Sequence, residues 1–182
     1  MAWYLISNVG NLVTGNRLKS LFEIKATSTI MDYFSYLENA YLLYFIPRFS
    51  YSARKQLVNA RKVYAIDPGL VQANSGSFHD DLGRKLENAV FLHLRRQWKE
   101  IYYFAEKKEC DFVVFDKGRI QAAIQVCYRL DQDNTPREFE GLLEALAFFN
   151  LPEGLVITFD QEDHFEIGGR HIQCLPAAKW MG

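Results

Sequence analysis

The sequence lacks a surplus of charge of either sign. Its 21 lysines and arginines are matched by 22 aspartates and glutamates, which gives a formal net charge of -1 over 182 residues. This balance excludes a global electrostatic attraction to nucleic acid or to an anionic membrane, because such attraction needs an excess of basic groups. Any contact with nucleic acid must therefore come from a local basic patch.

Cysteine is also scarce. The three cysteines, Cys110, Cys127 and Cys174, lie far apart in the sequence and show none of the C-x-x-C spacing of zinc or redox sites. An odd number of distant cysteines gives no complete disulfide framework. The sequence therefore predicts a reducing, cytoplasmic environment.

Long apolar runs and nucleotide motifs are missing as well. The longest uncharged apolar stretch, at residues 40–46, is far too short to span a bilayer. No G-x-x-x-x-G-K-[ST] phosphate loop occurs, so the chain by itself is not expected to bind ATP in the P-loop manner. What the sequence does have is a hydrophobic content of 49%, which is ample for one ordinary domain or two small ones.

The first part of the sequence has the pattern of a small winged helix. Apolar residues at helical spacing predict helices over 16–22 and 28–41, joined by the short link of a helix-turn-helix. Residues 40–46 are typical of a buried strand, and 48–61 are expected to turn back as a hairpin. We therefore predict a first domain over residues 1–62.

The rest of the sequence, residues 63–182, predicts a second domain with a mixed sheet flanked by helices. The predicted elements are strands at 63–67, 101–105, 110–115, 120–128, 154–160 and 165–174, and helices at 82–97 and 135–150. Pro68 and Gly69 predict a turn. Thr135 and Glu138 have the spacing of a capping box, with Pro136 at the first helical position. The predicted fold class is α/β (α+β).

Four residues of this second domain have the arrangement of a nuclease site. On a helical wheel, Glu87 lies at the edge of the apolar face of its helix. Strand alternation places Asp111 on an apolar face, and Gln125 and Cys127 share a face of the next strand. Asp111 and Gln125 are therefore expected to be neighbours across two adjacent strands.

This constellation is incomplete for phosphodiester hydrolysis. A nuclease of this type needs carboxylates to hold Mg²⁺ and a cation beside the attacking water. Gln125 stands where a carboxylate is expected, and Cys127 stands where a lysine is expected. Glu87, Asp111 and Gln125 remain the candidate ligands if Mg²⁺ binds, because a glutamine carbonyl can coordinate a metal. We expect little or no cleavage.

Three stretches carry a resemblance to a known family: KVYAIDPGL at 62–70, LGRKLENAVF at 82–91 and ECDFVV at 109–114. Together they resemble the C-terminal half of a family of prokaryotic AAA+ ATPases. In that family an ATPase domain precedes a winged helix, and a domain of unknown function similar to PD-(D/E)xK nucleases follows. The third nuclease motif of the family commonly reads Glu-Val-Lys, whereas this sequence has Gln125-Val126-Cys127. The resemblance implies that ATP is bound by an upstream domain that this chain lacks.

The first domain offers one candidate strip for nucleic acid. Basic residues gather in and around the predicted hairpin: Arg48, Arg54, Lys55, Arg61 and Lys62. The predicted recognition helix, in contrast, contains Asp32 and Glu38 but no basic residue, which favours a structural role over reading of the major groove. The alternative interpretation is that these basic residues lie in an ordinary solvent-exposed turn that has no binding role.

Three functional hypotheses follow. The leading one is an interaction or regulatory module of an AAA+ ATPase, nuclease-like but catalytically silent, which contacts protein or nucleic acid and no membrane. The alternatives are a divergent Mg²⁺-dependent DNA nuclease that uses Glu87 and Asp111, and a DNA-binding module without catalysis. Metal binding and salt-sensitive DNA association distinguish the three.

Overall fold

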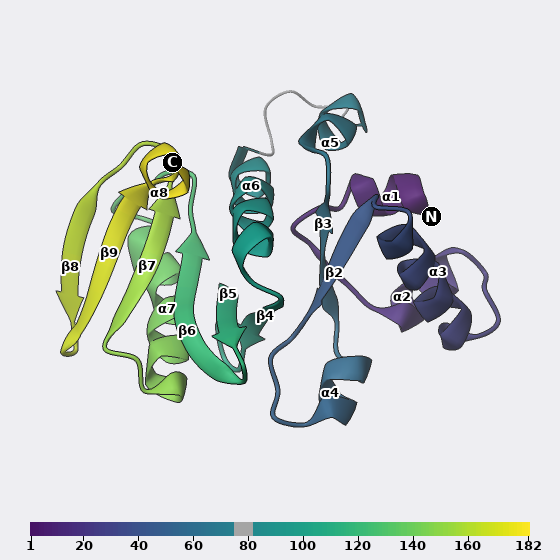
Figure 1. The fold of residues 1–182 in the computed structure, drawn as a ribbon, viewed down its shortest axis with the longest axis horizontal. Helices are drawn as coiled ribbons and strands as arrows, with labels where there is room; N and C mark the ends of the chain where they lie inside the picture. The colour runs from purple at the N-terminus through teal and green to yellow at the C-terminus, as the bar shows by residue number, and fades with distance from the viewer. Residues whose placement is uncertain (75–81) are drawn as a thin grey trace. The chain divides into compact units, whose positions relative to one another are not determined.

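The computed structural model describes residues 1–74 and 82–182, and these form two compact units, Met1–Arg84 and Lys85–Gly182. Both units combine helices with a sheet, so the protein is a mixed α/β protein (Figure 1). No helix among the described residues is long and apolar enough to cross a membrane.

The first unit is built around a three-stranded antiparallel sheet with the order β1-β3-β2. Its elements are α1 (Ala2–Ile6), β1 (Leu12–Val13), α2 (Gly15–Leu21), α3 (Thr27–Asn39), β2 (Leu43–Pro47), α4 (Ala53–Val58), β3 (Arg61–Ala65) and α5 (Pro68–Asn74). The two helices predicted from apolar periodicity are thus present as α2 and α3. The side chain of Thr14 caps α2 by accepting a hydrogen bond from the Arg17 N–H.

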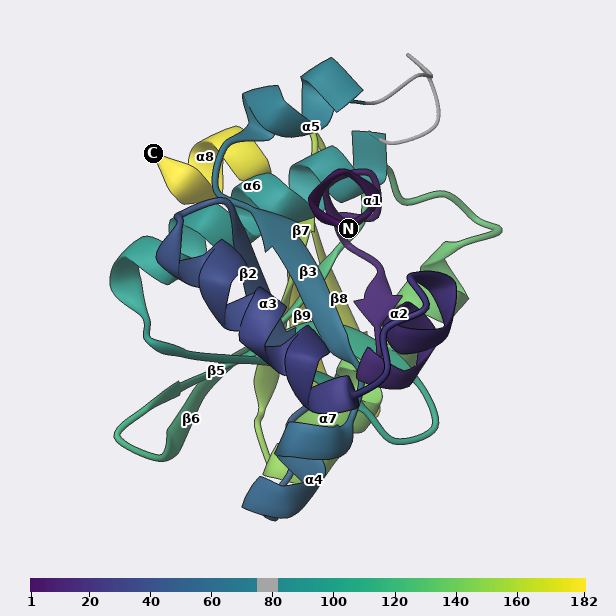
Figure 2. The ribbon, with the colours of Figure 1, turned by 90° about the vertical axis from the view of Figure 1, so that its right-hand side faces the viewer.

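A small apolar core joins α3 to the sheet. The rings of Phe34 on α3 and Phe45 on β2 are stacked with centroids 3.9 Å apart, and Leu18 and Ile30 are fully buried beside them in the same unit. Figure 2 shows α3 lying across the strands β2 and β3. Since an isolated two-stranded hairpin is marginally stable, the contact with α3 is what makes this small sheet viable.

Four features of the first unit differ from the sequence prediction. The strand that was expected to open the second domain at Val63 is β3, the central strand of the first sheet, where Val63 pairs with Phe45. The predicted hairpin is present as the antiparallel pair of β2 and β3, but the segment that connects these strands contains the helix α4. The predicted Pro68-Gly69 turn is the start of α5. The compact units accordingly divide after Arg84 and not after Lys62.

The second unit contains a six-stranded mixed sheet with the order β4-β5-β6-β7-β9-β8 (Figure 1). Its elements are α6 (Leu82–Gln97), β4 (Glu100–Ala105), β5 (Glu109–Asp116), β6 (Arg119–Val126), α7 (Thr135–Phe149), β7 (Glu153–Thr158), β8 (Asp163–Ile167), β9 (Arg170–Pro176) and α8 (Ala177–Met181). The pairs β6-β7 and β7-β9 are parallel, and the pairs β4-β5, β5-β6 and β8-β9 are antiparallel.

Helices pack on this sheet through aromatic and very small residues. Phe91 of α6 stacks on Phe112 of β5, and Phe149 of α7 makes an edge contact with Phe115. Gly141 brings α7 so close to β5 that a Cβ atom at this position would lie 1.8 Å from the carbonyl oxygen of Glu109. The position of α7 is therefore fixed closely against the strand that carries Asp111.

The sheet's last predicted strand and the start of α7 require corrections. The predicted strand at 165–174 is two strands, because Gly168 and Gly169 adopt positive φ angles and turn the chain from β8 into β9. The capping box is also wrong. The N-cap of α7 is Asn134, and the Thr135 hydroxyl donates instead to the carbonyl oxygen of Asp131.

Candidate functional site

Asp111 on β5 and Gln125 on β6 lie together and bind each other's strands through their side chains. The Asp111 N–H donates to Oε1 of Gln125 at 3.3 Å, and Oδ2 of Asp111 accepts the Val126 N–H at 2.9 Å. Both residues are 7% exposed. The sequence prediction that these two residues are neighbours therefore describes the structure.

A third side chain completes this arrangement, and sequence reasoning missed it. Glu138, in the first turn of α7, accepts a hydrogen bond from Nε2 of Gln125 at 2.9 Å through Oε2. Its other oxygen accepts from the guanidinium of Arg137 at 2.8 Å. The Glu138 side chain is only 13% exposed. A carboxylate is therefore present beside Gln125, but it comes from the following helix.

The orientation of the Gln125 amide follows from its neighbours. Its oxygen faces an N–H donor at Asp111, and its nitrogen faces a carboxylate acceptor at Glu138. The flipped amide would place an N–H₂ group against an N–H and a carbonyl against a carboxylate, which loses both hydrogen bonds. Gln125 thus acts as a bridge whose two ends are both in use.

These bonds engage the oxygen atoms that a metal ion would use. The oxygen that Gln125 could offer to Mg²⁺ and one oxygen of Asp111 are already accepting backbone N–H groups. In the part of the chain that the structure describes, no three Asp, Glu, His or Cys side chains form a group that could hold a metal ion. As arranged, the cluster is a closed hydrogen-bonded network.

Cys127 lies just beyond β6, half-buried, and its thiol is not an ionised group. Burial, followed by the negative charge of Glu138, raises the pKa of Cys127 from 9.0 to about 11. Its sulfur contacts the carbonyl oxygen of Arg129 at 3.2 Å. At neutral pH this residue provides neither the cation of a nuclease nor a thiolate nucleophile.

Glu87, the fourth predicted site residue, comes from a different element. It is half-buried on α6, one turn before Phe91, the residue that packs on Phe112 of β5. The hydrogen bonds that join Asp111, Gln125 and Glu138 come from β5, β6 and α7. Asp111 and Gln125 are thus joined to Glu138, and the charges of Glu138 and Asp111 act on the Cys127 thiol.

One signal in the sequence could have identified Glu138. It lies in the first turn of the helix that follows the third nuclease-like strand, and a short loop between strand and helix returns that turn to the sheet. The capping-box interpretation assigned the Glu138 carboxylate to the backbone at Thr135. In the structure the Asp131 carboxylate accepts the N–H groups of Asp133 and Asn134 just before the helix, and the Glu138 carboxylate accepts from Gln125.

The basic strip predicted for nucleic acid is dispersed in the first unit. Arg54 and Lys55 are exposed on α4, and Arg48 and Arg61 are partly buried. Arg61 lines a cavity of about 360 Å³ together with the start of α3. Lys62 is only 2% exposed in the central strand β3, so it cannot be part of a surface strip. The prediction treated Lys62 as a turn residue, and its place in a buried strand removes it.

Comparisons with known proteins place the two parts of the chain in families without an assigned function. Residues 82–180 match the family described as "Domain of unknown function (DUF4143)", a domain commonly found C-terminal to AAA-type ATPase domains. Residues 2–81 match "Domain of unknown function (DUF8612)". These ranges divide the chain close to the point where the two compact units meet. No solved structure gives a significant match.

Two curated relatives cover almost the whole chain. An uncharacterized protein of Methanocaldococcus jannaschii is 32% identical over 182 aligned residues, which is 91% of this chain and 38% of that protein. An uncharacterized protein of Haemophilus influenzae is 25% identical over 98% of this chain and 44% of its own length. The chain therefore spans well under half of the length of either relative.

Proposed function

Because the chain belongs to the family of the domain of unknown function DUF4143, we propose that it is a non-catalytic interaction module that operates beside an AAA-type ATPase domain. In this proposal the first unit is a winged helix and the second is a nuclease-like domain that has lost its chemistry. The topology of the first unit supports the winged-helix assignment, because the helices α2 and α3 precede the paired strands β2 and β3 in a sheet of order β1-β3-β2.

The closed network around Gln125 is the observation that carries the proposal. A metal-dependent nuclease must present carboxylate oxygens to Mg²⁺ and a cation to the attacking water. Here the Gln125 amide lies between Asp111 and Glu138 and is hydrogen-bonded to both. Cys127, at the position where a lysine is expected, is a protonated thiol at neutral pH. In this proposal the strands and the helix that would hold such a site are kept, and its polar side chains form hydrogen bonds with one another and with the backbone.

The proposal is tested by restoring the missing groups. The double variant Gln125→Glu/Cys127→Lys puts three carboxylates and a cation around one point, so we expect it to be less stable without metal and to gain thermal stability in millimolar Mn²⁺ or Mg²⁺. The wild-type protein is expected to show no such gain. Adding Asp111→Asn to the double variant is the matched control, and it should abolish the gain.

Two results would contradict the proposal. One is a metal-dependent rise in the melting temperature of the wild-type protein that Asp111→Asn removes. The other is metal-dependent cleavage of plasmid or branched DNA by the wild-type protein that requires Asp111 and Glu87. Either result would favour the divergent nuclease.

A further inference from the structure

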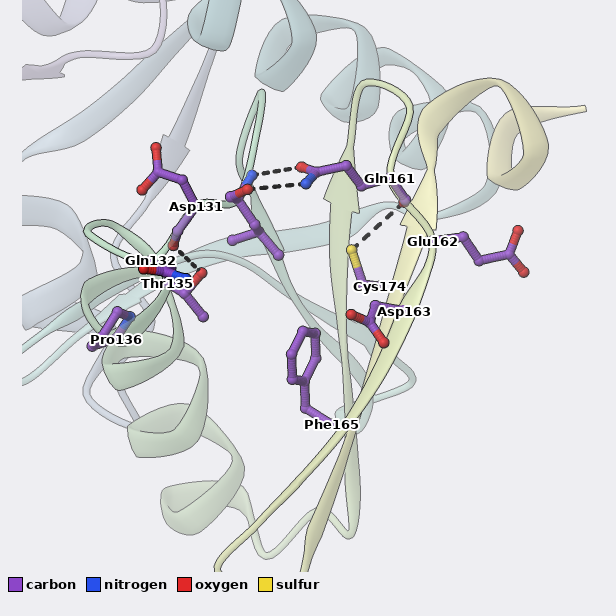
Figure 3. A pocket seen from close by; sticks show the side chains of 10 residues that line it. Asp131, Gln132, Thr135, Pro136, Gln161, Glu162, Asp163, Phe165 and Cys174 are labelled. Carbon is purple, nitrogen blue, oxygen red and sulfur yellow. Dashed lines mark hydrogen bonds between the residues drawn. The ribbon is translucent and has the colours of Figure 1, made fainter.

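A second site of the molecule lies at the carboxyl ends of the parallel strands. The segments that follow β6 and β7, together with β8 and β9, enclose a cavity of about 630 Å³ (Figure 3). Its lining residues are Leu130, Asp131, Gln132, Thr135, Pro136, Gln161, Glu162, Asp163, Phe165 and Cys174. In sheets with parallel strands, this edge is where ligands commonly bind.

The walls of the cavity are fixed by hydrogen bonds. The side-chain amide of Gln161 makes two of them to the backbone of Leu130, accepting its N–H at 2.6 Å and donating to its carbonyl at 2.9 Å (Figure 3). The Gln161 backbone is held in turn, because its N–H and carbonyl both bond to the Thr158 hydroxyl. The cavity is therefore a preformed feature of the second unit.

The charge of the lining excludes an anionic ligand. Three of the ten residues, Asp131, Glu162 and Asp163, are acidic and none is basic. The start of α7 also faces the cavity, but the Asp131 carboxylate already accepts the N–H groups that precede this helix. Lys179 pairs with Glu162 at 2.5 Å and offsets one of the three charges.

The remaining lining suits a flat cation with an apolar stem. Phe165 is half-buried and packs edge-on against Phe139, with ring centroids 4.9 Å apart. It lines the same cavity as Asp163, two residues earlier on β8 (Figure 3). The guanidinium group of an arginine side chain stacks on aromatic rings and bonds to carboxylates, while the methylene stem of the same side chain covers apolar groups such as Leu130.

The cavity wall also contains the Cys174 thiol. Burial, with a contribution from the charge of Asp163, raises the pKa of this thiol.

The position of the cavity points to a polypeptide as the source of this cation. Asp163 and Phe165 belong to β8, which ends the strand order and, among the described residues, pairs only with β9. An edge strand presents backbone N–H and C=O groups to an added strand, whose side chains can enter a neighbouring pocket. We propose that the β8 edge and this cavity bind an extended segment of a partner protein and that the cavity takes an arginine side chain of that segment.

The proposal is independent of whether the Gln125 network is silent, and its test uses the whole chain. In NMR titrations, N-acetyl-arginine amide is expected to shift the backbone amide signals of the cavity residues saturably, whereas the uncharged N-acetyl-citrulline amide is not. Asp163→Asn should weaken the binding by about two- to fivefold, because it removes one charge and keeps the shape. Glu166→Gln, on the same strand but outside the lining, is the matched control and should leave the affinity unchanged.

A second variant keeps the test decisive. Phe165→Leu retains apolar volume and removes the aromatic face, so it should also weaken binding of the arginine compound. Equal shifts with citrulline, equal effects of Asp163→Asn and Glu166→Gln, or no saturable shift in the wild-type protein would overturn the proposal. Binding of putrescine without binding of the arginine compound would also overturn it, because the ligand would then be a free amine.

Discussion

At the scale of single residues, Gln125 and Cys127 stand at the positions where the sequence comparison with nucleases predicts a carboxylate and a lysine. Gln125 does not leave a gap where a carboxylate is expected, since its amide joins the Asp111 backbone to Glu138. Cys127 does not replace a lysine, since burial keeps its thiol protonated. Both residues turn an open constellation into a closed one.

The thiol of Cys127 provides a test at this scale. Its pKa is raised from 9.0 to about 11, so at pH 8 we expect iodoacetamide to alkylate it about tenfold more slowly in the native than in the unfolded chain. The smaller thiolate fraction slows the reaction, and the higher intrinsic nucleophilicity of a thiolate of higher pKa offsets part of that effect. Mass spectrometry of the peptide that contains Cys127 measures the rate. Glu138→Gln, which removes the second cause of the shift, should speed the native reaction.

The same shift has a defined effect on stability. The unfolded chain loses the thiol proton near pH 9 and the native chain near pH 11, so the unfolded state holds fewer protons between these values. The contribution of Cys127 to the free energy of unfolding is therefore complete below pH 9 and is lost as the pH rises toward 11.

The alkylation experiment can contradict this description. If the native protein is alkylated at pH 8 at the same rate as the unfolded chain, the thiol is not held in its neutral form.

At the scale of elements, the close approach of α7 to β5 positions Glu138. The helix comes within contact of the Glu109 carbonyl only because residue 141 has no side chain. A tight helix contact of this kind aligns the first turn of α7 with the end of β6, where Gln125 lies. The network thus depends on packing about one turn further along the helix, at Gly141.

Gly141→Ala is expected to destabilise the protein by about 1–3 kcal/mol or more, because its Cβ would overlap the Glu109 carbonyl and α7 must shift. Gly83→Ala is the matched control. Gly83 lies in α6 with nothing within 4 Å of the added Cβ, so the same substitution should stabilise by about 0.4–1 kcal/mol. Urea unfolding followed by circular dichroism measures both. A Gly141→Ala variant as stable as Gly83→Ala would contradict the packing described for α7.

At the scale of the whole molecule, the chain consists of two units that each have a sheet and a core of their own. The buried residues of the first unit, such as Phe34 and Leu43, lie in the elements α1 to α5, and those of the second, such as Phe112 and Leu142, lie from α6 onward. The family match at residues 82–180 has nearly the same limits as the second unit.

We expect a fragment of residues 82–182, which keeps α6 whole, to fold on its own. A core with a six-stranded sheet and packed helices is large enough for independent stability. Dispersed amide signals in an NMR spectrum and a cooperative thermal transition are the expected results. A disordered fragment, compared with a full chain that unfolds cooperatively in the same buffer, would show that the second unit depends on the first.

Much of this organisation is determined by the sequence alone. Apolar periodicity predicts the bounds of α2, α3, α6, α7 and most strands to within a few residues. It does so because side chains return to the buried face at a fixed period, 3.6 residues in a helix and two in a strand. Strand alternation also brings Asp111 beside Gln125. The sequence by itself also shows that Gln125 and Cys127 stand where a nuclease site would have a carboxylate and a lysine.

Only the tertiary structure decides the rest, because it depends on which strands and helices meet. Pairing with β2 assigns Val63 to the first unit, and a central strand position buries Lys62. Packing of α7 on β5 brings Glu138 to Gln125, a contact between residues 13 positions apart that depends on how the helix docks on the sheet. The cavity at the strand ends likewise exists only where the segments after β6 and β7 face β8 and β9.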